Sequence, residues 1–158
     1  MEPAFEEIVA RHLDELYQGA LHLAGNRRDD AEELLLEMAT NAARQFRRAR
    51  PEDPEAFLDR ELIRTFLKRP DRGIRDSDPG EAQPRLEGEG AEWALGALGA
   101  LAPPIRAVIW LVVVRRRPYG QVAEFLQVDR QRVAGWVRDG HRQLFQAGAR
   151  EPWRRESR

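Results

Sequence analysis

The sequence predicts an all-α protein made of two small helical domains joined by a flexible linker, with a helix-turn-helix in the second domain. Three observations support this. Apolar residues recur at helical spacing over much of the chain, a central stretch is nearly without large apolar residues, and two amphipathic segments near the end are separated by three residues. The expected units are domains at residues 1–69 and 93–149, a Pro- and Gly-rich linker at 70–92 and a basic tail at 150–158.

The first domain is expected to contain three helices. The first, over residues 3–24, ends at Gly25-Asn26, which tolerate positive φ. The second begins at Asp29 or Asp30 as N-cap, and the third covers residues 54–69. The residues expected to face the core are Phe5, Ile8, Val9, Leu13, Leu16, Tyr17, Ala20 and Leu23, then Ala31, Leu34, Leu35, Met38, Ala42 and Phe46, and finally Leu58, Leu62, Ile63, Phe66 and Leu67.

The second domain begins with a helical pattern at Trp93 that breaks at Pro103-Pro104 and continues from Ile105 to Arg115. Its valine-rich part has strand propensity, but a lone strand would have no partner elsewhere in the sequence, so we expect a helix. This helix is apolar nearly all round, which predicts an exposed surface for a partner.

Residues 117–144 predict the helix-turn-helix. Pro118 is suited to a helix start, and Asp129 is suited to cap a second helix after a short break. One face of this second helix is apolar, and the other carries Arg130, Gln131, Arg132, Arg138 and Arg142. Arginine and glutamine at a helix start can contact base edges in a major groove. The alternative is an ordinary helical hairpin with a solvated basic face.

The charge distribution favours two different partners. The whole chain has a net charge of −1, but residues 1–92 hold 14 Lys+Arg against 22 Asp+Glu, whereas residues 93–158 hold 12 arginines against 5 acids. A basic helix-turn-helix half suits phosphate, and an acidic half suits a protein partner. An acidic half can also be simply a well-solvated surface.

Several classes of function are disfavoured. The chain has no cysteine, and its three histidines are scattered without the spacing of a zinc site. It has no glycine-rich phosphate loop or nucleophile elbow, so we expect neither an enzyme nor a cofactor. The longest apolar run, Ala107 to Val114, is too short to span a bilayer, and no signal peptide is visible. We therefore expect a cytoplasmic protein without membrane insertion.

Four segments, in this order, resemble the extracytoplasmic-function group of bacterial RNA polymerase sigma factors. They are His12-Leu13-Asp14-Glu15-Leu16-Tyr17, Asp30-Ala31-Glu32-Glu33-Leu34-Leu35-Leu36-Glu37, Leu101-Ala102-Pro103 with Arg106, Val108 and Leu111, and Pro118-Tyr119 through Leu144. The order and spacing of the four are more specific than any one of them. The resemblance covers most of the chain and implies a cytoplasmic factor that binds core RNA polymerase and promoter DNA to direct transcription initiation.

The resemblance also implies roles for individual residues. The surface that docks on core polymerase would be formed by Asp30, Glu32, Glu33, Leu36 and Glu37. Arg64, Lys68 and Arg69 would lie near the DNA backbone of the −10 element, and Arg47 to Pro54 falls where the family holds a flipped base. The −35 element would be contacted by Arg130, Gln131, Arg132, Ala134, Gly135 and Arg138.

The sequence departs from the family in several ways, including Phe57 in place of the tryptophan of the third helix and Ala134-Gly135-Trp136 in place of a typically basic or hydroxyl-bearing stretch. Leu36 replaces a clamp-contacting glutamine and lies off the buried stripe, so we expect an exposed leucine. Gln127 replaces the usual turn glycine. We also find no cluster of exposed aromatic residues able to hold an unstacked base.

These departures keep two alternatives open. One is a sigma-like adaptor or regulator that binds a protein, such as an anti-sigma factor or polymerase, without opening promoters. The other is a dimeric helix-turn-helix repressor, which we rank lower because the first domain shows no dimer seam.

Overall fold

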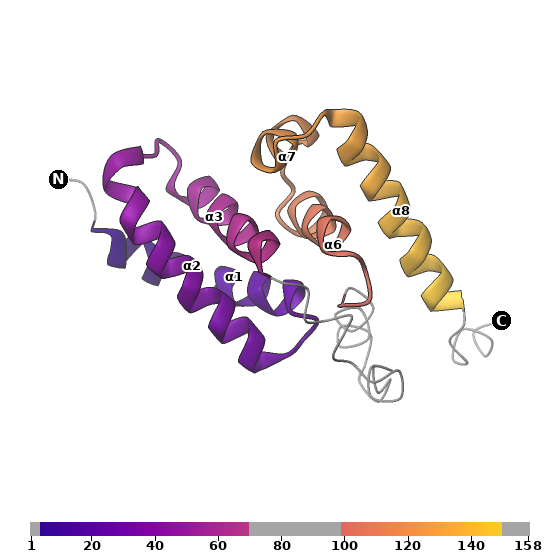
Figure 1. Cartoon of the computed structure of the whole chain (residues 1–158), viewed down its shortest axis with the longest axis horizontal. Coiled ribbons are helices and arrows are strands. Elements are labelled where there is room, and N and C mark those ends of the chain that lie inside the picture. The colour runs from indigo at the N-terminus through magenta and orange to yellow at the C-terminus, as the bar shows by residue number, and fades with distance from the viewer. Residues whose placement is uncertain (1–3, 70–98, 150–158) are drawn as a thin grey trace.

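The computed structural model describes residues 4–69 and 99–149. Within these ranges it contains α-helices and one π-helical segment and no strand, which confirms the all-α prediction. The expected helix from Trp93 lies almost entirely outside the described residues, and the expected linker over 70–92 and tail over 150–158 lie wholly outside them. Figure 1 shows two groups of helices, α1–α3 and α6–α8, side by side. We call them the N-terminal half and the C-terminal half.

The N-terminal half contains α1 (Phe5–Leu23), α2 (Arg28–Ala49) and α3 (Pro54–Lys68). As predicted, α1 ends where Gly25 and Asn26 take positive φ, at 63° and 67°. The expectation that Asp29 or Asp30 caps α2 is wrong. The helix begins earlier, with Arg27 in the N-cap position and no side-chain cap, so both aspartates lie in its first turn.

In the third helix, Asp53 is the N-cap, and its carboxylate accepts a hydrogen bond from the Ala56 amide at 3.1 Å. Pro54 follows at the first helical position, where the missing N–H has no partner to lose. These two residues fix where α3 starts and therefore fix the turn that joins it to α2.

The C-terminal half contains α6 (Pro103–Ile109), the π-helical η1 (Trp110–Val114), α7 (Tyr119–Leu126) and α8 (Arg130–Ala149). The helix expected from Ile105 to Arg115 is confirmed as helical, with a change of winding that the sequence did not predict. The Arg115 amide bonds to the Trp110 carbonyl at 3.0 Å, a five-residue step, and the Arg117 amide bonds to the Leu111 carbonyl at 2.9 Å. The wider winding ends the helix and directs the chain into α7.

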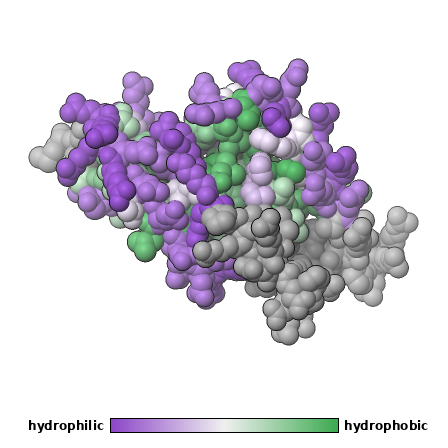
Figure 2. Space-filling view, in the orientation of Figure 1, coloured by the Kyte–Doolittle hydropathy of each residue, from purple (hydrophilic) through white to green (hydrophobic). Residues whose placement is uncertain are grey.

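Both halves contribute to one hydrophobic core. Leu16 and Leu62 from the N-terminal half are buried in the same cluster as Trp110 and Leu111 from the C-terminal half. Gly19 makes this contact possible, since a Cβ there would lie 2.4 Å from Cζ2 of Trp110. Figure 2 shows hydrophobic side chains gathered over α6 and α7, flanked by hydrophilic surface on either side. The described helices therefore form a single packed body.

This packing changes three expectations. The apolar run from Ile105 to Leu111 is buried, because α6 and the start of η1 contact α1 and α3 on one side while α8 covers α6 on the other. The exposed apolar surface expected there is therefore wrong except at Val113 and Val114, which are 50% and 47% exposed. Leu13 and Leu67, expected in the core, are instead 45% and 38% exposed because they lie at the margins of their helical stripes.

The same packing buries polar residues of α3 that lie outside the apolar stripe expected to face the core. Asp59, Glu61 and Thr65 are each no more than 3% exposed. The amphipathic pattern of α3 predicts only one buried face, whereas α3 contacts α1 and α2 as well as α6 and α7. No helix within the described residues has both the length and the apolar character needed to cross a membrane.

Candidate functional site

The helices α7 and α8 form a pair joined by only three residues, Gln127 to Asp129. Gln127, which replaces the turn glycine usual in the family that the sequence resembles, takes the left-handed conformation at φ 56°. The Val128 amide then bonds to the Ala123 carbonyl at 3.0 Å. As predicted, Asp129 caps the second helix, with its carboxylate accepting from the Arg132 amide at 2.7 Å. The pair is therefore fixed by backbone and capping hydrogen bonds at the turn.

Buried contacts hold α8 against the rest of the C-terminal half. Val133 and Val137 are buried from α8, and they belong to the same cluster as Val122 and Ala123 of α7. Gly140 lies so close to Ile109 that a Cβ would be 2.7 Å from its Cδ1. One face of α8 is thus fully used in packing, and the opposite face is available to solvent.

The polar residues predicted on α8 lie on that opposite face. The side chains of Arg130, Gln131, Arg132 and Arg138 are all exposed. The Arg132 guanidinium lies over the Trp136 ring at 5.5 Å from its centroid, while Arg130 folds back over the α7 backbone at Gly120. The structure therefore brings these residues together as a basic strip, which we call the α8 strip.

Two small residues accompany the strip. Ala134 and Gly135 are half-buried, and a Cβ at Gly135 would meet nothing within 4 Å. Since packing does not explain this glycine, it leaves the helix backbone open to close approach from outside.

The acidic residues predicted on α2 form a second surface, which we call the α2 face. Glu32, Glu33 and Glu37 are exposed, and Leu36 among them is 71% exposed, as predicted. Asp30 is half-buried and pairs with Arg27 at 3.1 Å.

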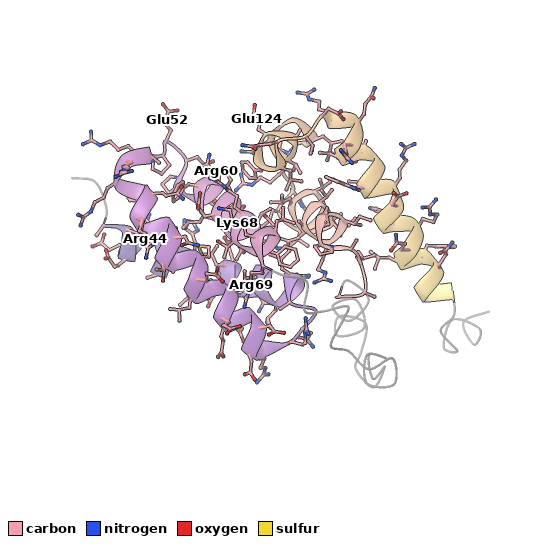
Figure 3. The ribbon with its side chains drawn as sticks, in the orientation of Figure 1. Arg44, Glu52, Arg60, Lys68, Arg69 and Glu124 are labelled. Atoms are coloured by element: carbon pink, nitrogen blue, oxygen red, sulfur yellow. The ribbon has the colours of Figure 1, made fainter. Side chains whose placement is uncertain are left out.

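Arg69, predicted near the DNA backbone of the −10 element, forms ion pairs with residues of the α2 face. Its Nη2 lies 2.6 Å from Oε2 of Glu33 and its Nε lies 3.7 Å from Oε2 of Glu37, while Nη1 donates to the Asp30 carbonyl at 3.4 Å. Arg69 therefore ties the end of α3 to the α2 face and neutralises part of its charge. Of the three cations expected near the −10 element, Lys68 is exposed, and Arg64 pairs with buried Glu61 at 3.4 Å. Figure 3 shows Arg44, Arg60, Lys68 and Arg69 on α2, α3 and the end of α3.

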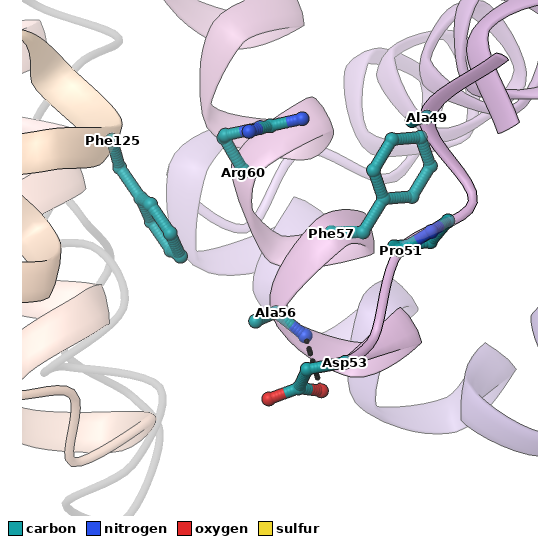
Figure 4. Close-up of a pocket in the computed structure, with 7 residues that line it drawn as sticks. All are labelled: Ala49, Pro51, Asp53, Ala56, Phe57, Arg60 and Phe125. Carbon is teal, nitrogen blue, oxygen red and sulfur yellow. Dashed lines mark hydrogen bonds between the residues drawn. The ribbon is translucent and has the colours of Figure 1, made fainter.

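A pocket of about 270 Å³ lies at the turn between α2 and α3 (Figure 4). The rings of Phe57 and Phe125 contribute to its walls, with Arg60 beside them. Within the described residues, the buried Nε of Arg60 has no hydrogen-bond partner, and its guanidinium lies 5.6 Å from the centroid of Phe57. The remaining lining residues are Ala49, Pro51, Asp53 and Ala56.

Phe57 of α3 and Phe125 of α7 line the same pocket, and only the packing of the two halves places them there. Phe57 is 3% exposed, so the two rings are not a cluster of exposed aromatic residues. No local sequence signal could have paired Phe57 with Phe125.

Five charged residues form a cluster between the halves, which the sequence analysis also missed. The buried carboxylate of Asp59 accepts from Nε of Arg115 at 2.9 Å and from Nη2 of Arg117 at 2.8 Å. Arg115 also pairs with Glu55, and with Glu15 at 3.3 Å. We call these five residues the ion cluster. Its only sequence signal was three consecutive arginines at 115–117, which by themselves predict a solvated basic segment.

Burial affects the proton affinities in the ion cluster. Desolvation raises the pKa of the Asp59 carboxyl, against the lowering effect of the hydrogen bonds from Arg117 and Arg115. Desolvation would lower the pKa of the Arg115 guanidinium, but its hydrogen bond to Asp59 and the carboxylates around it raise the value above normal. The described residues contain no group of three or more His, Asp or Glu that could hold a metal ion.

No protein-family model matches the chain, and no curated protein shows significant sequence similarity to it. What the protein binds is therefore inferred from the geometry of the α8 strip, the α2 face and the pocket at the turn between α2 and α3, together with the resemblance of the four sequence segments.

Proposed function

We propose that this protein is a transcription initiation factor of the sigma type, which binds core RNA polymerase and directs it to specific promoters. The observation that carries the proposal is the α8 strip. Arg130, Gln131 and Arg132 are exposed at the start of a helix whose opposite face is packed and whose N-terminus is held by a three-residue turn. Two helices joined in this way resemble a helix-turn-helix, in which the start of the second helix is presented to the major groove, and this resemblance supports the proposal.

The residue types suit base recognition. An arginine guanidinium can donate two parallel hydrogen bonds to guanine, and a glutamine amide can pair with adenine. Arg138 lies two turns further along α8, where a cation can contact phosphate. The open space beside Gly135 lets the helix backbone approach the edge of a base pair.

The α2 face provides the proposed contact with polymerase. It combines exposed carboxylates with an exposed leucine, a composition that suits a protein partner better than nucleic acid. Glu32 is the most direct residue to change, because Glu33 and Glu37 also pair with Arg69.

The test is a titration of dye-labelled protein against core RNA polymerase, followed by fluorescence anisotropy. We expect saturable binding with a submicromolar Kd, weakened at least tenfold by Glu32→Lys and by reversing Glu33 and Glu37 together. Arg69→Ala is the control, because it breaks the same ion pairs but leaves the acidic face in place. Saturable binding that none of these variants changes would contradict the proposed docking surface.

Exposed Leu36 favours a second candidate, an adaptor that binds a protein partner and does not open promoters. The two candidates differ in transcription from a promoter-bearing template in vitro. The initiation factor gives a transcript with core polymerase, whereas the adaptor binds its partner and gives none.

A further inference from the structure

Several arginines of this protein lie over aromatic rings, and one of them differs from the others. Arg60, Arg106 and Arg115 each lie over a ring and also pair with a carboxylate or donate to backbone carbonyls. Arg132 lies over the ring of Trp136, and its guanidinium has no hydrogen bond or ion pair with any described residue. This arginine is therefore placed by a ring while its donors are uncommitted, a combination suited to binding an acceptor from outside.

Trp136 is itself held by the packing of the C-terminal half. Its side chain packs against the buried cluster of Leu101, Ile105 and Ile109, and it also contacts the main core. Side chains in a helix lean toward the helix start, so the ring of Trp136 covers the turn that contains Arg132, four positions earlier. The ring thus connects an exposed arginine of the α8 strip to the packed interior.

The contact leaves the guanidinium able to bind a second group. The face of an aromatic ring attracts a cation through its quadrupole, and tryptophan does so most strongly. The ring offers no conventional hydrogen-bond acceptor, so all five N–H groups of Arg132 keep their capacity to donate. A guanine edge presents two acceptors, O6 and N7, which match the paired donors of an arginine.

Gly135 leaves the space beside this pair open. It lies one turn after Arg132 and directly before Trp136, and a Cβ at this position would meet nothing within 4 Å. Glycine weakens a helix interior, and no packing contact compensates for it here. The edge of a base pair can therefore approach the helix backbone at the place where Arg132 is held.

The other arginine at the start of α8 has a different support. Nη2 of Arg130 lies 2.6 Å from the position that a Cβ at Gly120 would take, so this guanidinium covers the start of α7. Arg130 and Arg132 are therefore directed to different places, and of these two only Arg132 lies over a ring. We expect the two arginines to contribute differently to any contact with DNA.

We propose that Trp136 is a positioning residue for Arg132, and that Arg132 held in this way recognises guanine at one base pair of the bound DNA. This step rests on the function proposed above, because it concerns the same helix. An arginine that is already ordered loses less side-chain freedom on binding than a freely moving one, so preorganisation strengthens the contact. Trp136 therefore contributes to base preference through its neighbour.

Nuclear magnetic resonance tests the contact in the free protein. The ring current of Trp136 should shift the Cδ protons and the Nε–H of Arg132 upfield, because they lie over the ring face. Trp136→Leu keeps an apolar side chain for packing and should return these signals to the values of a mobile arginine, whereas Trp136→Phe should retain most of the shift. Signals that Trp136→Leu leaves in place would overturn the contact.

The effect on specificity is measured with a duplex that the unmodified protein selects from a random pool, and with every single-base-pair substitution of that duplex. Arg132→Ala should abolish the preference at one G·C pair, and loss of preference at an A·T pair instead would overturn the recognition of guanine. Trp136→Leu should raise the Kd for the selected duplex about two- to tenfold and weaken the preference at the same base pair, while Trp136→Phe should retain most of both. In an Arg132→Ala background, Trp136→Leu should have no further effect, because Trp136 acts through Arg132.

Leu144→Ala is the matched control. Leu144 packs against the same buried cluster as Trp136 and from the same helix, but it lies about 18 Å along the helix from Arg132. Its substitution should lower the melting temperature and leave the base preference unchanged. Loss of the same preference in Leu144→Ala would show that Trp136 acts through packing alone and would overturn its positioning role.

Failure of this proposal and failure of the proposed function give different results. If the protein selects a sequence but Trp136→Leu weakens all duplexes alike, or adds its full effect to that of Arg132→Ala, the positioning role is overturned and the proposed function stands. If the unmodified protein selects no sequence from the pool, the promoter-binding part of the proposed function is overturned, and the recognition of guanine with it.

Discussion

Arg106 of α6 donates a hydrogen bond from Nη1 to the carbonyl of Leu23 at 2.5 Å, across 83 positions of sequence. The acceptor lies in the last turn of α1, where helix carbonyls have no partner within the helix. The same guanidinium donates from Nη2 to the carbonyls of Gly99 and Leu101, at 2.7 and 2.9 Å. One side chain thus closes the end of α1 and fixes the entry to α6.

We predict that Arg106→Met lowers the free energy of unfolding by about 3 kcal/mol or more, because buried carbonyls lose their donors and methionine supplies none. Chemical denaturation followed by circular dichroism measures the change. Arg116→Met is the control, since Arg116 is exposed in the same half and should change stability by about 0.5 kcal/mol at most. Equal effects of the two substitutions would show that the buried contacts of Arg106 are not the source of its contribution.

The α8 strip predicts distinct effects on DNA binding. With a duplex selected from a random pool by the unmodified protein, Arg132→Ala should raise the Kd about five- to hundredfold, because one base contact contributes about 1–3 kcal/mol. Gln131→Ala should relax the preference at one base pair. Filter binding or anisotropy on the selected and substituted duplexes measures both effects.

Arg138 should act on phosphate. Arg138→Ala should weaken binding to all duplexes alike and reduce the slope of log K against log salt by about 0.9. Arg142→Ala provides the comparison, because Arg142 already pairs with Asp139 at 2.9 Å. A salt slope unaffected by Arg138→Ala would exclude the phosphate contact.

We predict that substitution of Leu36 changes the binding of a partner without changing the stability of the fold. Leu36→Gln should change the free energy of unfolding by no more than about 0.5 kcal/mol, since the side chain is 71% exposed. Leu34→Gln, two positions away and 1% exposed, should cost about 3 kcal/mol or more. If Leu36 contributes to a partner surface, Leu36→Gln should alter the affinity for core polymerase while the melting temperature stays the same.

His22 predicts a pH dependence of stability. Burial lowers the pKa of this imidazole from its ordinary 6.5, and its buried Nδ1 has no hydrogen-bond partner among the described residues. Below pH 6.5 the unfolded chain binds a proton at this position more readily than the folded protein does. The contribution of neutral His22 to the free energy of unfolding is therefore fully present above pH 6.5 and is lost as the pH falls through the pKa of His22 in the folded protein.

Denaturation from pH 8 to pH 4 should show this loss in the unmodified protein, at no more than about 1.4 kcal/mol per pH unit from this one group. His22→Gln should remove the His22 part of the slope, because glutamine does not titrate. If the free energy of unfolding depends on pH in the same way in both proteins, His22 is not the source of the loss.

The sequence alone determined the helical class and most helix positions, because these depend on local periodicity and capping chemistry. The paired glycine and asparagine after α1, the Asp129 cap and the exposed Leu36 were all predicted from neighbouring residues and were confirmed. The DNA-contacting and polymerase-docking roles of the α8 strip and the α2 face stay predictions.

The tertiary structure decided which helix faces are covered. A helical pattern records one apolar stripe, so it could not predict that α3 is covered on a second side and buries Asp59, nor that the apolar helix from Ile105 is internal. The same holds for Phe57 with Phe125 and for Arg106 with Leu23, which are far apart in sequence. Such pairs form only when whole helix faces pack against one another, and no local segment of the sequence specifies that packing.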